Sequence, residues 1–523
     1  MQKGIDKYSI DSTDYTVGQD NVQKWGFDVH NPVFGVSAGF IALFLIAALV
    51  LDAETAKAAL DGIKWQIIGS FDWLFIWSGN IFVIFCLALI VSPFGKIRLG
   101  GTDAVADYSW LSWLAMLFAA GMGIGLMFWS VAEPAAYYTG WYETPLGVEA
   151  NTPEAAKLAL GATMYHWGLH PWAIYGVVAL SLAFFTYNKG LPLSIRSIFY
   201  PILGDRAWGW AGHIVDILAV LATLFGLATS LGLGAQQAAS GIHHVFGIEA
   251  GMGLQIAVIT VVTLLAVVSV IRGIDGGVKV ISNINMIIAF VLLALVALIG
   301  YAVALGSIPT TVMAYVENII PLSNPHGRSD EAWFQGWTVF YWAWWISWSP
   351  FVGMFIARVS KGRTVREFIT AVLIVPTTVT ILWMSVFGGM AIDQIQNGVG
   401  DLGTKGLTDV PLAMFQMFDV LPYGTLLSVV AVVLVLVFFI TSSDSGSLVI
   451  DSITAGGKVD APVLQRVFWA FMEGAIAVAL LWVGGTKAIE ALQAGAISTA
   501  LPFTFILLLM CVSLLMGMRT EKR

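Results

Sequence analysis

The sequence predicts an all-α polytopic membrane protein with twelve transmembrane helices, and three observations predict this class. The chain of 523 residues is 58% hydrophobic and only 11% charged, whereas soluble proteins carry about 25% charged residues. Its mean hydropathy is +0.83. The apolar residues gather in runs of about 20, which is the length of helix that crosses a bilayer.

Twelve such runs can be read along the chain. We expect spans at residues 33–51, 71–92, 109–132, 158–187, 211–240, 253–271, 281–305, 333–357, 367–391, 421–447, 467–484 and 489–517. None of these spans contains a Lys or Arg residue, although Arg466 stands at the edge of the eleventh.

The Lys and Arg residues predict the orientation of the spans. Nineteen of the 25 lie in the two tails and the even-numbered loops, and the odd-numbered loops hold only six. Positively charged loops stay in the cytoplasm. Both termini are therefore expected to be cytoplasmic, which an even number of spans allows.

Several functional classes are disfavoured. The formal net charge of −8 argues against nucleic acid as a partner. Cys86 and Cys511 lie in apolar runs and predict neither a disulfide framework nor a metal site. No GxxxxGK[ST] pattern of a nucleotide-driven pump and no repeated filter element of a channel is found. A convergent acid/base cluster is also missing, so we expect no enzyme and no cofactor.

The segments outside the spans are polar. The first 32 residues lack the apolar core of a signal peptide and predict a cytosolic tail. Residues 133–157, 306–332 and 392–420 form long loops on the outer side. The second of these contains MAYVENIIPL, which predicts a short amphipathic helix at the interface.

The third span carries three glycines at alternate positions: Gly121, Gly123 and Gly125. Each glycine inside a helix costs about 1 kcal/mol relative to alanine, so the three together predict a broken helix. Close helix packing through small residues is the alternative, but it needs a spacing of four, which Gly123 does not have. Broken helices at mid-membrane are typical of transporter sites.

The fourth span reads MYHWGLHPWAIYGVV, with aromatic residues in mid-run and Pro171 expected to kink the helix. His166 and His170 are four residues apart and could share a metal. No carboxylate or thiol accompanies them in the sequence, so helix packing is the better expectation for both.

The eighth span holds five tryptophans within twelve residues: Trp337, Trp342, Trp344, Trp345 and Trp348. In a membrane, Trp usually lies at the two interfaces, but here the rings run through the span. Residues four apart on a helix share a face. Aromatic faces in a low-dielectric site attract cations, and quaternary ammonium groups above all. We therefore expect these rings to form one wall of a binding site for a cationic group. The alternative is that they form an interfacial belt or pack tightly against other helices.

The tenth span ends in VFFITSSDSGSLVI, in which Thr441 to Ser447 are rich in oxygen atoms. Hydroxyl groups in apolar helices often bond only to the preceding turn, but six polar residues in seven positions exceed that habit. A hard cation such as sodium prefers oxygen ligands. Asp444 and Glu473 are the acids expected at membrane depth, where ionisable residues are functional candidates, although Asp444 could instead cap its helix.

These motifs resemble the betaine–choline–carnitine transporter family. The resemblance runs from about residue 30 to 515 and rests on AAGMGIGLMFW at 119–129, HWGLHPWAIY at 166–175, YWAWWISWSPFVGMFIAR at 341–358 and ITSSDSGS at 440–447. It implies a LeuT-type core of two inverted five-helix repeats, here spans three to seven and eight to twelve. The implied organisation is a tail at 1–32, two peripheral spans at 33–108, a first repeat at 109–305, a periplasmic connector at 306–332, a second repeat at 333–517 and a tail at 518–523.

The resemblance also implies a substrate site. An aromatic box would be formed by Trp167, Trp172, Tyr175, Trp344, Trp345 and Trp348, and Gly123 and Gly125 of the broken helix would border the substrate. Choline carriers of the family place an acid where Gly125 stands. Without that counter-charge, a zwitterion such as glycine betaine suits this site better than choline.

A sodium site is implied next to the broken helix. It would use the carbonyl groups of Ala119, Met122 and Phe438 and the hydroxyl groups of Thr441 and Ser442. A second sodium site of related symporters would involve Thr223 and Phe351, but Leu227 stands where a second threonine is expected. Sodium-independent exchangers place an arginine in the fifth span, and no Lys or Arg lies between Arg206 and Arg272.

The resemblance therefore implies a sodium-coupled symporter for a compatible solute in the bacterial inner membrane, with osmoprotection as its role. Members are commonly trimers. A sodium-independent exchanger and a choline or carnitine carrier are the alternatives within the family. Osmosensing members end in a long basic helix, whereas this sequence ends at Arg523, so we expect uptake without that sensor.

Overall fold

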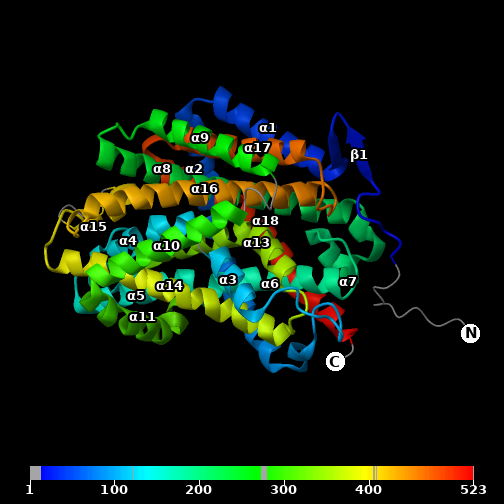
Figure 1. The fold of residues 1–523 in the computed structure, drawn as a ribbon, viewed down its shortest axis with the longest axis horizontal. Helices are drawn as coiled ribbons and strands as arrows, with labels where there is room; N and C mark the ends of the chain where they lie inside the picture. Colours follow the sequence, from blue (N-terminus) through cyan, green and yellow to red (C-terminus); the bar gives the residue numbers. More distant parts are fainter. Residues whose placement is uncertain (1–12, 122, 273–278, 404–406, 408, 522–523) are drawn as a thin grey trace, which may run out of the picture.

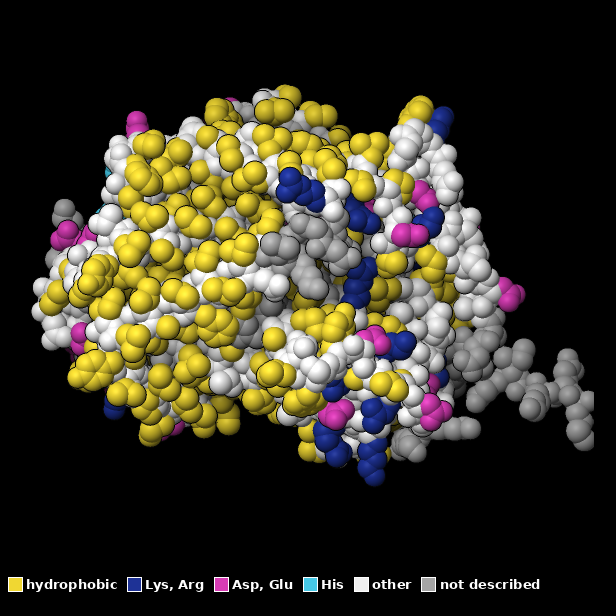
Figure 2. Space-filling view, in the orientation of Figure 1, with side chains coloured by type: hydrophobic (Ala, Val, Ile, Leu, Met, Phe, Trp, Pro, Cys, Tyr) yellow, Lys and Arg dark blue, Asp and Glu magenta, His cyan; other side chains and the backbone are white. Residues whose placement is uncertain are grey.

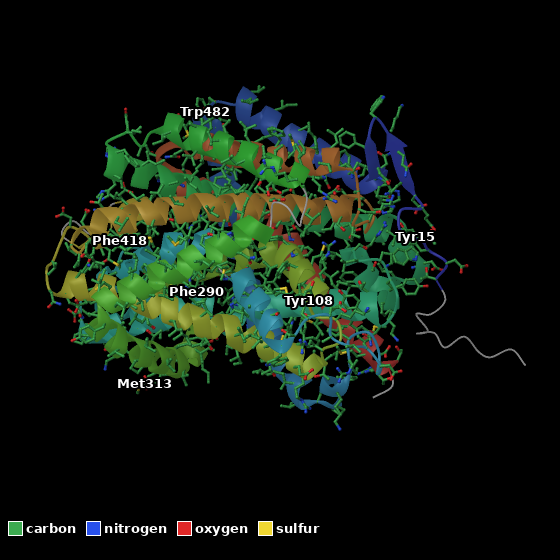
Figure 3. All side chains as sticks on the ribbon, viewed as in Figure 1. Tyr15, Tyr108, Phe290, Met313, Phe418 and Trp482 are labelled. Carbon is green, nitrogen blue, oxygen red and sulfur yellow. The ribbon has the colours of Figure 1, made fainter. Side chains whose placement is uncertain are left out.

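The computed structural model describes residues 13–121, 123–272, 279–403, 407 and 409–521. Long helices run side by side, with both termini at one end of the bundle and the short helix α15 (Ala413–Asp419) at the other (Figure 1). The labelled side chains of Tyr15 and Phe418 mark these two ends (Figure 3). The predicted all-α membrane class is confirmed, since ten helical stretches of the described residues are long and apolar enough to cross a membrane.

A small hairpin precedes the helices. Strands β1 (Asn21–Lys24) and β2 (Phe27–His30) pair antiparallel across a two-residue turn in which Trp25 and Gly26 both have positive φ, as a type I′ turn requires. The hairpin docks on the helical bundle, because Lys458 pairs with Asp28 at 2.5 Å. Part of the expected polar tail is therefore folded.

Helix α1 (Asn31–Val50) matches the first predicted span, but α2 (Ala53–Val91) is much longer than predicted. Its N-cap Asp52 accepts a hydrogen bond from the Thr55 amide at 2.9 Å. The pair Lys57–Asp61 then joins successive turns. These capping and i,i+4 contacts extend the helix far ahead of its apolar run.

The predicted break in the third span is confirmed. Helix α3 (Trp110–Gly121) ends before the break, and α4 (Ile124–Thr139) begins after it. Gly123, which lies between the two helices, has an extended backbone. The expected loop at 133–157 is wrong at both ends, because α4 continues to Thr139 and α5 (Pro153–Trp167) starts early. The run VAEPAAYY is apolar apart from Glu133, and this carboxyl group is fully buried.

The fourth span is broken rather than kinked at Pro171. Helix α5 ends at Trp167 and α6 (Leu169–Tyr187) begins after Gly168. Pro171 lies in the first turn of α6, where a missing amide costs nothing. The Tyr315 hydroxyl of α11 (Tyr301–Leu322) accepts a hydrogen bond from the Leu169 amide at 2.8 Å and so caps the start of α6.

The remaining elements of the first half are η1 (Pro93–Lys96), η2 (Pro145–Gly147), η3 (Ile195–Phe199), α7 (Tyr200–Leu203), η4 (Gly204–Trp208), α8 (Trp210–Phe246), α9 (Met252–Arg272) and α10 (Lys279–Ile299). The expected short helix in the connector is wrong in size: α11 (Tyr301–Leu322) has 22 residues and follows α10 after a single residue, Gly300. It packs against α5 and α14 (Val365–Gln396). The predicted seventh span therefore ends six residues early.

The second half contains α12 (Glu331–Trp333), a π-helical turn at Phe334–Thr338, α13 (Val339–Val359), α14 (Val365–Gln396), α15 (Ala413–Asp419), α16 (Gly424–Thr454), α17 (Val463–Gly484) and α18 (Ala488–Arg519). Each of the twelve predicted ranges is largely helical. The twelve-span topology itself stays a prediction, because α11 is also long and apolar enough to cross a membrane.

The surface agrees with a membrane setting. Hydrophobic side chains cover most of the visible face, and the Lys and Arg side chains gather toward the end that holds the termini (Figure 2). Many large apolar side chains are exposed, including Leu43, Leu49 and Ile320. Such a continuous apolar surface is typical of contact with lipid or with another copy of the chain.

This charge distribution predicts that both termini face the cytoplasm. A reporter fused after Arg523 should give the cytoplasmic signal, and the same reporter inserted in the 392–420 segment should give the opposite one, because positively charged ends stay inside. Matching signals from the two positions would contradict the twelve-span topology.

Candidate substrate site

A cavity lies where the break between α3 and α4 faces α5, α6, α13 and α14. It is lined by Gly123, Gly125, Leu126, Trp167, Pro171, Trp172, Tyr175, Trp344, Trp345, Trp348 and Thr380. The structure thus brings all six aromatic residues of the predicted box and both predicted glycines to one place. Leu126, Pro171 and Thr380 line the cavity as well, and sequence reasoning did not include them.

The tryptophan rings form a corner. Trp344 and Trp345 stack with ring centroids 4.8 Å apart and an angle of 13° between their planes. Trp167 meets Trp345 edge to face at 4.9 Å and 73°. Stacked and perpendicular rings present ring faces in two directions, which is the geometry in which a cation can contact more than one π system.

The other side of the box comes from α6. Trp172 and Tyr175 meet at 5.4 Å and 81°. Tyr175 also lies 6.3 Å from Trp345 across the cavity. Trp172, Tyr175 and Trp345 are all buried, so a ligand held between them would be largely removed from water.

Hydrogen bonds fix the ring orientations on α13. The indole N–H of Trp344 donates to the Ser230 hydroxyl at 3.1 Å. The N–H of Trp345 donates to the His166 carbonyl at 2.9 Å, and that of Trp348 to the Gly226 carbonyl at 3.0 Å. Each acceptor is a neutral group on another helix, so the rings are held by the bundle rather than by α13 alone.

Gly125 permits the closest approach in the site. A Cβ atom at this position would lie 2.8 Å from the Cη2 atoms of both Trp167 and Trp344. Real side chains do not sustain such contacts, so any substitution must displace at least one ring. At Gly123, by contrast, a Cβ atom would meet nothing within 4 Å, and the open backbone there borders the cavity.

Behind Trp167 lies a buried carboxyl group that sequence reasoning missed. Glu133 contacts the Trp167 N–H at 2.7 Å, the Tyr341 hydroxyl at 2.5 Å, the Tyr137 hydroxyl at 2.8 Å and His166 Nδ1 at 2.9 Å. The expected loop at 133–157 assigned this residue to the exterior. The apolar run that continues on both sides of Glu133 is the signal that places it in a helix.

The two histidines of the fourth span point to different partners. His166 Nε2 contacts the Thr338 hydroxyl at 3.0 Å, and His170 Nε2 contacts the Asn80 side chain at 3.2 Å. His170 also stacks on Trp342 with centroids 5.1 Å apart. Packing explains both residues, and within the described ranges no group of three or more His, Cys, Asp or Glu side chains could hold a metal ion.

The predicted sodium ligands lie on two elements. Met122 lies outside the described residues, and Ala119 belongs to the last turn of α3. Phe438, Thr441 and Ser442 lie in α16, and the Thr441 hydroxyl lies 3.1 Å from the carbonyl groups of both Val437 and Phe438. Helix α16 contacts α4, the second half of the broken span.

The residues of the second predicted sodium site also lie on neighbouring helices. Thr223 of α8 is fully buried, and its hydroxyl donates to the Ala219 carbonyl at 2.7 Å. Phe351 of α13 packs edge to face on Trp348 at 5.4 Å. Leu227 packs closely against Gly446, since a Cβ atom at position 446 would lie 2.3 Å from the Leu227 Cδ1 atom. The side chain at position 227 is therefore hydrocarbon and offers no oxygen ligand to a sodium ion.

Asp444 and Glu473 are both buried inside the bundle. The Ser269 hydroxyl donates to Asp444 at 2.5 Å, and the Ser443 hydroxyl donates to Glu473 at 3.0 Å. Asp444 lies within α16, which continues to Thr454. It therefore does not cap the end of that helix.

Comparison with known proteins adds an independent finding. A family model described as BCCT, betaine/carnitine/choline family transporter, matches residues 32–523. The chain is 88% identical over 523 residues to glycine betaine transporter 1 of Vibrio parahaemolyticus, covering all of both chains. It is 66% identical over 521 residues to the glycine betaine/proline/choline/ectoine transporter VP1456 of the same organism, with coverage of 100% and 93%.

A more distant relative also aligns with nearly the whole chain. The glycine betaine transporter OpuD of Bacillus subtilis is 41% identical over 498 residues, which covers 93% of this chain and 95% of that protein. The match to the family model spans both the aromatic cavity and the oxygen-rich segment of α16. This multi-pass membrane protein therefore belongs to the betaine/carnitine/choline family of transporters and is not an enzyme.

Proposed function

We propose that this transporter is a sodium-coupled symporter that imports glycine betaine or a closely related zwitterionic solute. The observation that carries the proposal is that six aromatic side chains line one and the same cavity. A trimethylammonium group has diffuse charge and no N–H donor, so ring faces recognise it better than a carboxylate does. The names of the relatives at 88% and 41% identity also point to glycine betaine.

The proposed mechanism is alternating access in an inverted-repeat core. The first repeat would be residues 109–305 and the second 333–517, with 33–108 peripheral and 306–332 as the connector. Discontinuous helices at a midplane site are typical of such folds, and both α3–α4 and α5–α6 are interrupted beside the cavity. We place the protein in the bacterial inner membrane, as a homotrimer that serves osmoprotection.

Two features support sodium as the coupling ion. Thr441 and Ser442 offer hydroxyl groups on α16 next to α4, and helix α8 contains no Lys or Arg that could replace a cation. Leu227 argues against full use of the second site at Thr223 and Phe351. One sodium ion per cycle is therefore the simplest stoichiometry.

The alternatives are a sodium-independent exchanger and a choline or carnitine carrier. The relative at 66% identity is named for choline and ectoine as well as glycine betaine and proline, which favours a broad substrate range as the second candidate. Uptake of radiolabelled glycine betaine into proteoliposomes, with and without an inward sodium gradient, separates these functions. Counterflow without sodium would indicate the exchanger.

Sodium-driven uptake should be electrogenic. A zwitterion adds no charge, so each sodium ion gains about 2.3 kcal/mol per 100 mV, enough for a concentration gradient of about fifty-fold. Thr441→Ala and Ser442→Ala should each raise the sodium concentration for half-maximal uptake about ten- to a hundredfold, because a polar group that contacts an ion contributes about 1.5–3 kcal/mol.

The matched control for these two variants is Thr499→Ala in α18, whose hydroxyl makes the same bonds to its own helix. It should leave the sodium dependence unchanged. The assignment of the sodium site fails if Thr441→Ala, Ser442→Ala and Thr499→Ala share the wild-type sodium dependence.

Replacement of Trp345 should separate attraction by a ring face from simple packing. Both Trp345→Phe and Trp345→Leu lose the hydrogen bond to the His166 carbonyl, but only Phe keeps a π face. A cation–π contact is worth about 0.5–2 kcal/mol, so Leu should raise the apparent KM about two- to thirty-fold more than Phe does. We expect Trp172→Ala to be as severe as Trp345→Ala.

Concentration-dependent uptake and tryptophan fluorescence measure these affinities. Trp337→Phe is the control, because Trp337 packs on Trp129, Tyr137 and Trp141 and does not line the cavity. Equal affinities for Phe and Leu at position 345 would mean that shape alone selects the substrate.

Gly125 should control the charge of the accepted substrate. Any side chain here displaces Trp167 or Trp344, so Gly125→Asn should weaken glycine betaine binding. Gly125→Asp has the same size but adds a carboxylate and should gain inhibition by choline. Competition of choline against glycine betaine uptake is the measurement, and equal behaviour of Asn and Asp would show that position 125 does not sense the substrate's charge.

A further inference from the structure

Glu133 is a buried acid directly behind the aromatic box. It lies in α4 with no exposed surface. We propose that the carboxylate of Glu133 is the fixed negative charge that makes this cavity select substrates with a permanently cationic head group, an ammonium or a sulfonium. This inference deepens the proposed function and rests on it, because it concerns the same cavity.

The hydrogen bonds around Glu133 favour the ionised form. One oxygen, Oε2, lies 2.5 Å from the Tyr341 hydroxyl and 2.7 Å from the Trp167 N–H. The other, Oε1, lies 2.8 Å from the Tyr137 hydroxyl and 2.9 Å from His166 Nδ1. A carboxylate is an acceptor at both oxygens, and several donors directed at it stabilise the charged state.

No Lys or Arg among the described residues lies within ion-pair distance of this carboxylate. Among the described residues, His166 is its only partner within ion-pair distance, and a neutral imidazole with its proton on Nδ1 already provides the donor. The nearby Arg328 is paired with Asp330 at 2.7 Å. A buried charge without a counter-ion is unfavourable, so a cation bound in the adjacent cavity offsets it.

Trp167 and Tyr341 connect the Glu133 carboxylate to the aromatic cavity, because both donate hydrogen bonds to this carboxylate. The Trp167 ring lines the cavity, and its N–H donates directly to Glu133. Donation to an anion is a strong, charge-assisted bond that leaves the indole ring more electron-rich, and a more negative ring face attracts a cation more strongly. Tyr341 also stacks on Trp345 with centroids 5.8 Å apart.

Orientation of the rings alone does not require a charge. The N–H groups of Trp344, Trp345 and Trp348 are held by a serine hydroxyl and two backbone carbonyls. A neutral acceptor therefore suffices to fix a ring in this bundle. Of these four tryptophans in the described part of the chain, Trp167 alone donates to a carboxylate. Burying a carboxylate is costly, which points to a use for the charge itself.

Two ligands of the same shape test the proposal. Glycine betaine and 3,3-dimethylbutanoate differ only in the atom that carries the three methyl groups, which is nitrogen with a positive charge or neutral carbon. Binding of each to the purified full-length protein is measured by tryptophan fluorescence at saturating sodium. The decisive quantity is the ratio of the two dissociation constants.

In Glu133→Gln, the affinity for glycine betaine should fall at least tenfold while that for 3,3-dimethylbutanoate changes less than threefold, so the ratio should fall by several-fold or more. A role in positioning alone would weaken both ligands in parallel. Glu154→Gln, which removes an exposed acid at the start of α5, is the matched control and should leave both affinities unchanged.

Unchanged discrimination in a folded Glu133→Gln protein would overturn the inference. If that variant does not fold, Trp167→Phe takes its place, because it keeps a ring and removes the N–H that contacts Glu133; a ratio within twofold of the wild-type value would then overturn it. Wild-type protein that binds no glycine betaine would refute the proposed function instead, so the two failures are distinguishable.

Discussion

The absence of a side chain at Gly125 is the constraint on which the rest of the site depends. Trp167 of α5 and Trp344 of α13 bring their ring edges to within 2.8 Å of the position that a Cβ atom would occupy. The corner of rings around the cavity can form only because nothing fills that space. The same glycine-rich stretch ends α3 and leaves Gly123 extended beside the cavity. One short sequence therefore supplies both the break and the room for the rings.

At the second break, at Gly168, three other helices supply hydrogen bonds to the free backbone groups. Backbone groups freed inside a membrane must find partners within the protein. The Leu169 amide donates to Tyr315 of α11, the His166 carbonyl accepts from Trp345 of α13, and the Trp167 carbonyl accepts from Thr380 of α14 at 3.1 Å. These bonds hold Trp167 beside the break, and they connect the aromatic rings of the cavity to α11, α13 and α14.

The amino-acid sequence was sufficient to predict the fold class, the location of the helices and the break at Gly121 to Gly125, because hydrophobic runs and glycine spacing are local signals. It was also sufficient to bring six aromatic residues to one cavity through a family resemblance. It did not predict the long α2, the full α11 or the break at Gly168. Those features depend on contacts from distant segments, such as the Tyr315 cap, and on capping residues outside the apolar runs.

Glu133 escaped prediction for a different reason. A single acid within an apolar run is easily taken for the boundary of a span, and its burial depends on hydrogen-bond donors from two other helices, His166 and Trp167 of α5 and Tyr341 of α13. Only the folded arrangement brings these donors to one carboxyl group. Burial of a polar group is tolerated when its hydrogen bonds are satisfied, and no local pattern reveals that condition.

The polarity of α4 gives the cavity a direction that suits the proposed zwitterion. The helix begins at Ile124, beside the two glycines that line the cavity, and the N-terminus of a helix carries partial positive charge with free N–H groups. Glu133 lies nine residues further along the same helix, about 13 Å at 1.5 Å per residue. A ligand with its carboxylate toward the start of α4 and its onium group toward Trp167 therefore aligns with the field from both ends. Choline has no carboxylate and would gain only the second of these interactions, so the polarity of this one helix would favour the proposed zwitterion over choline.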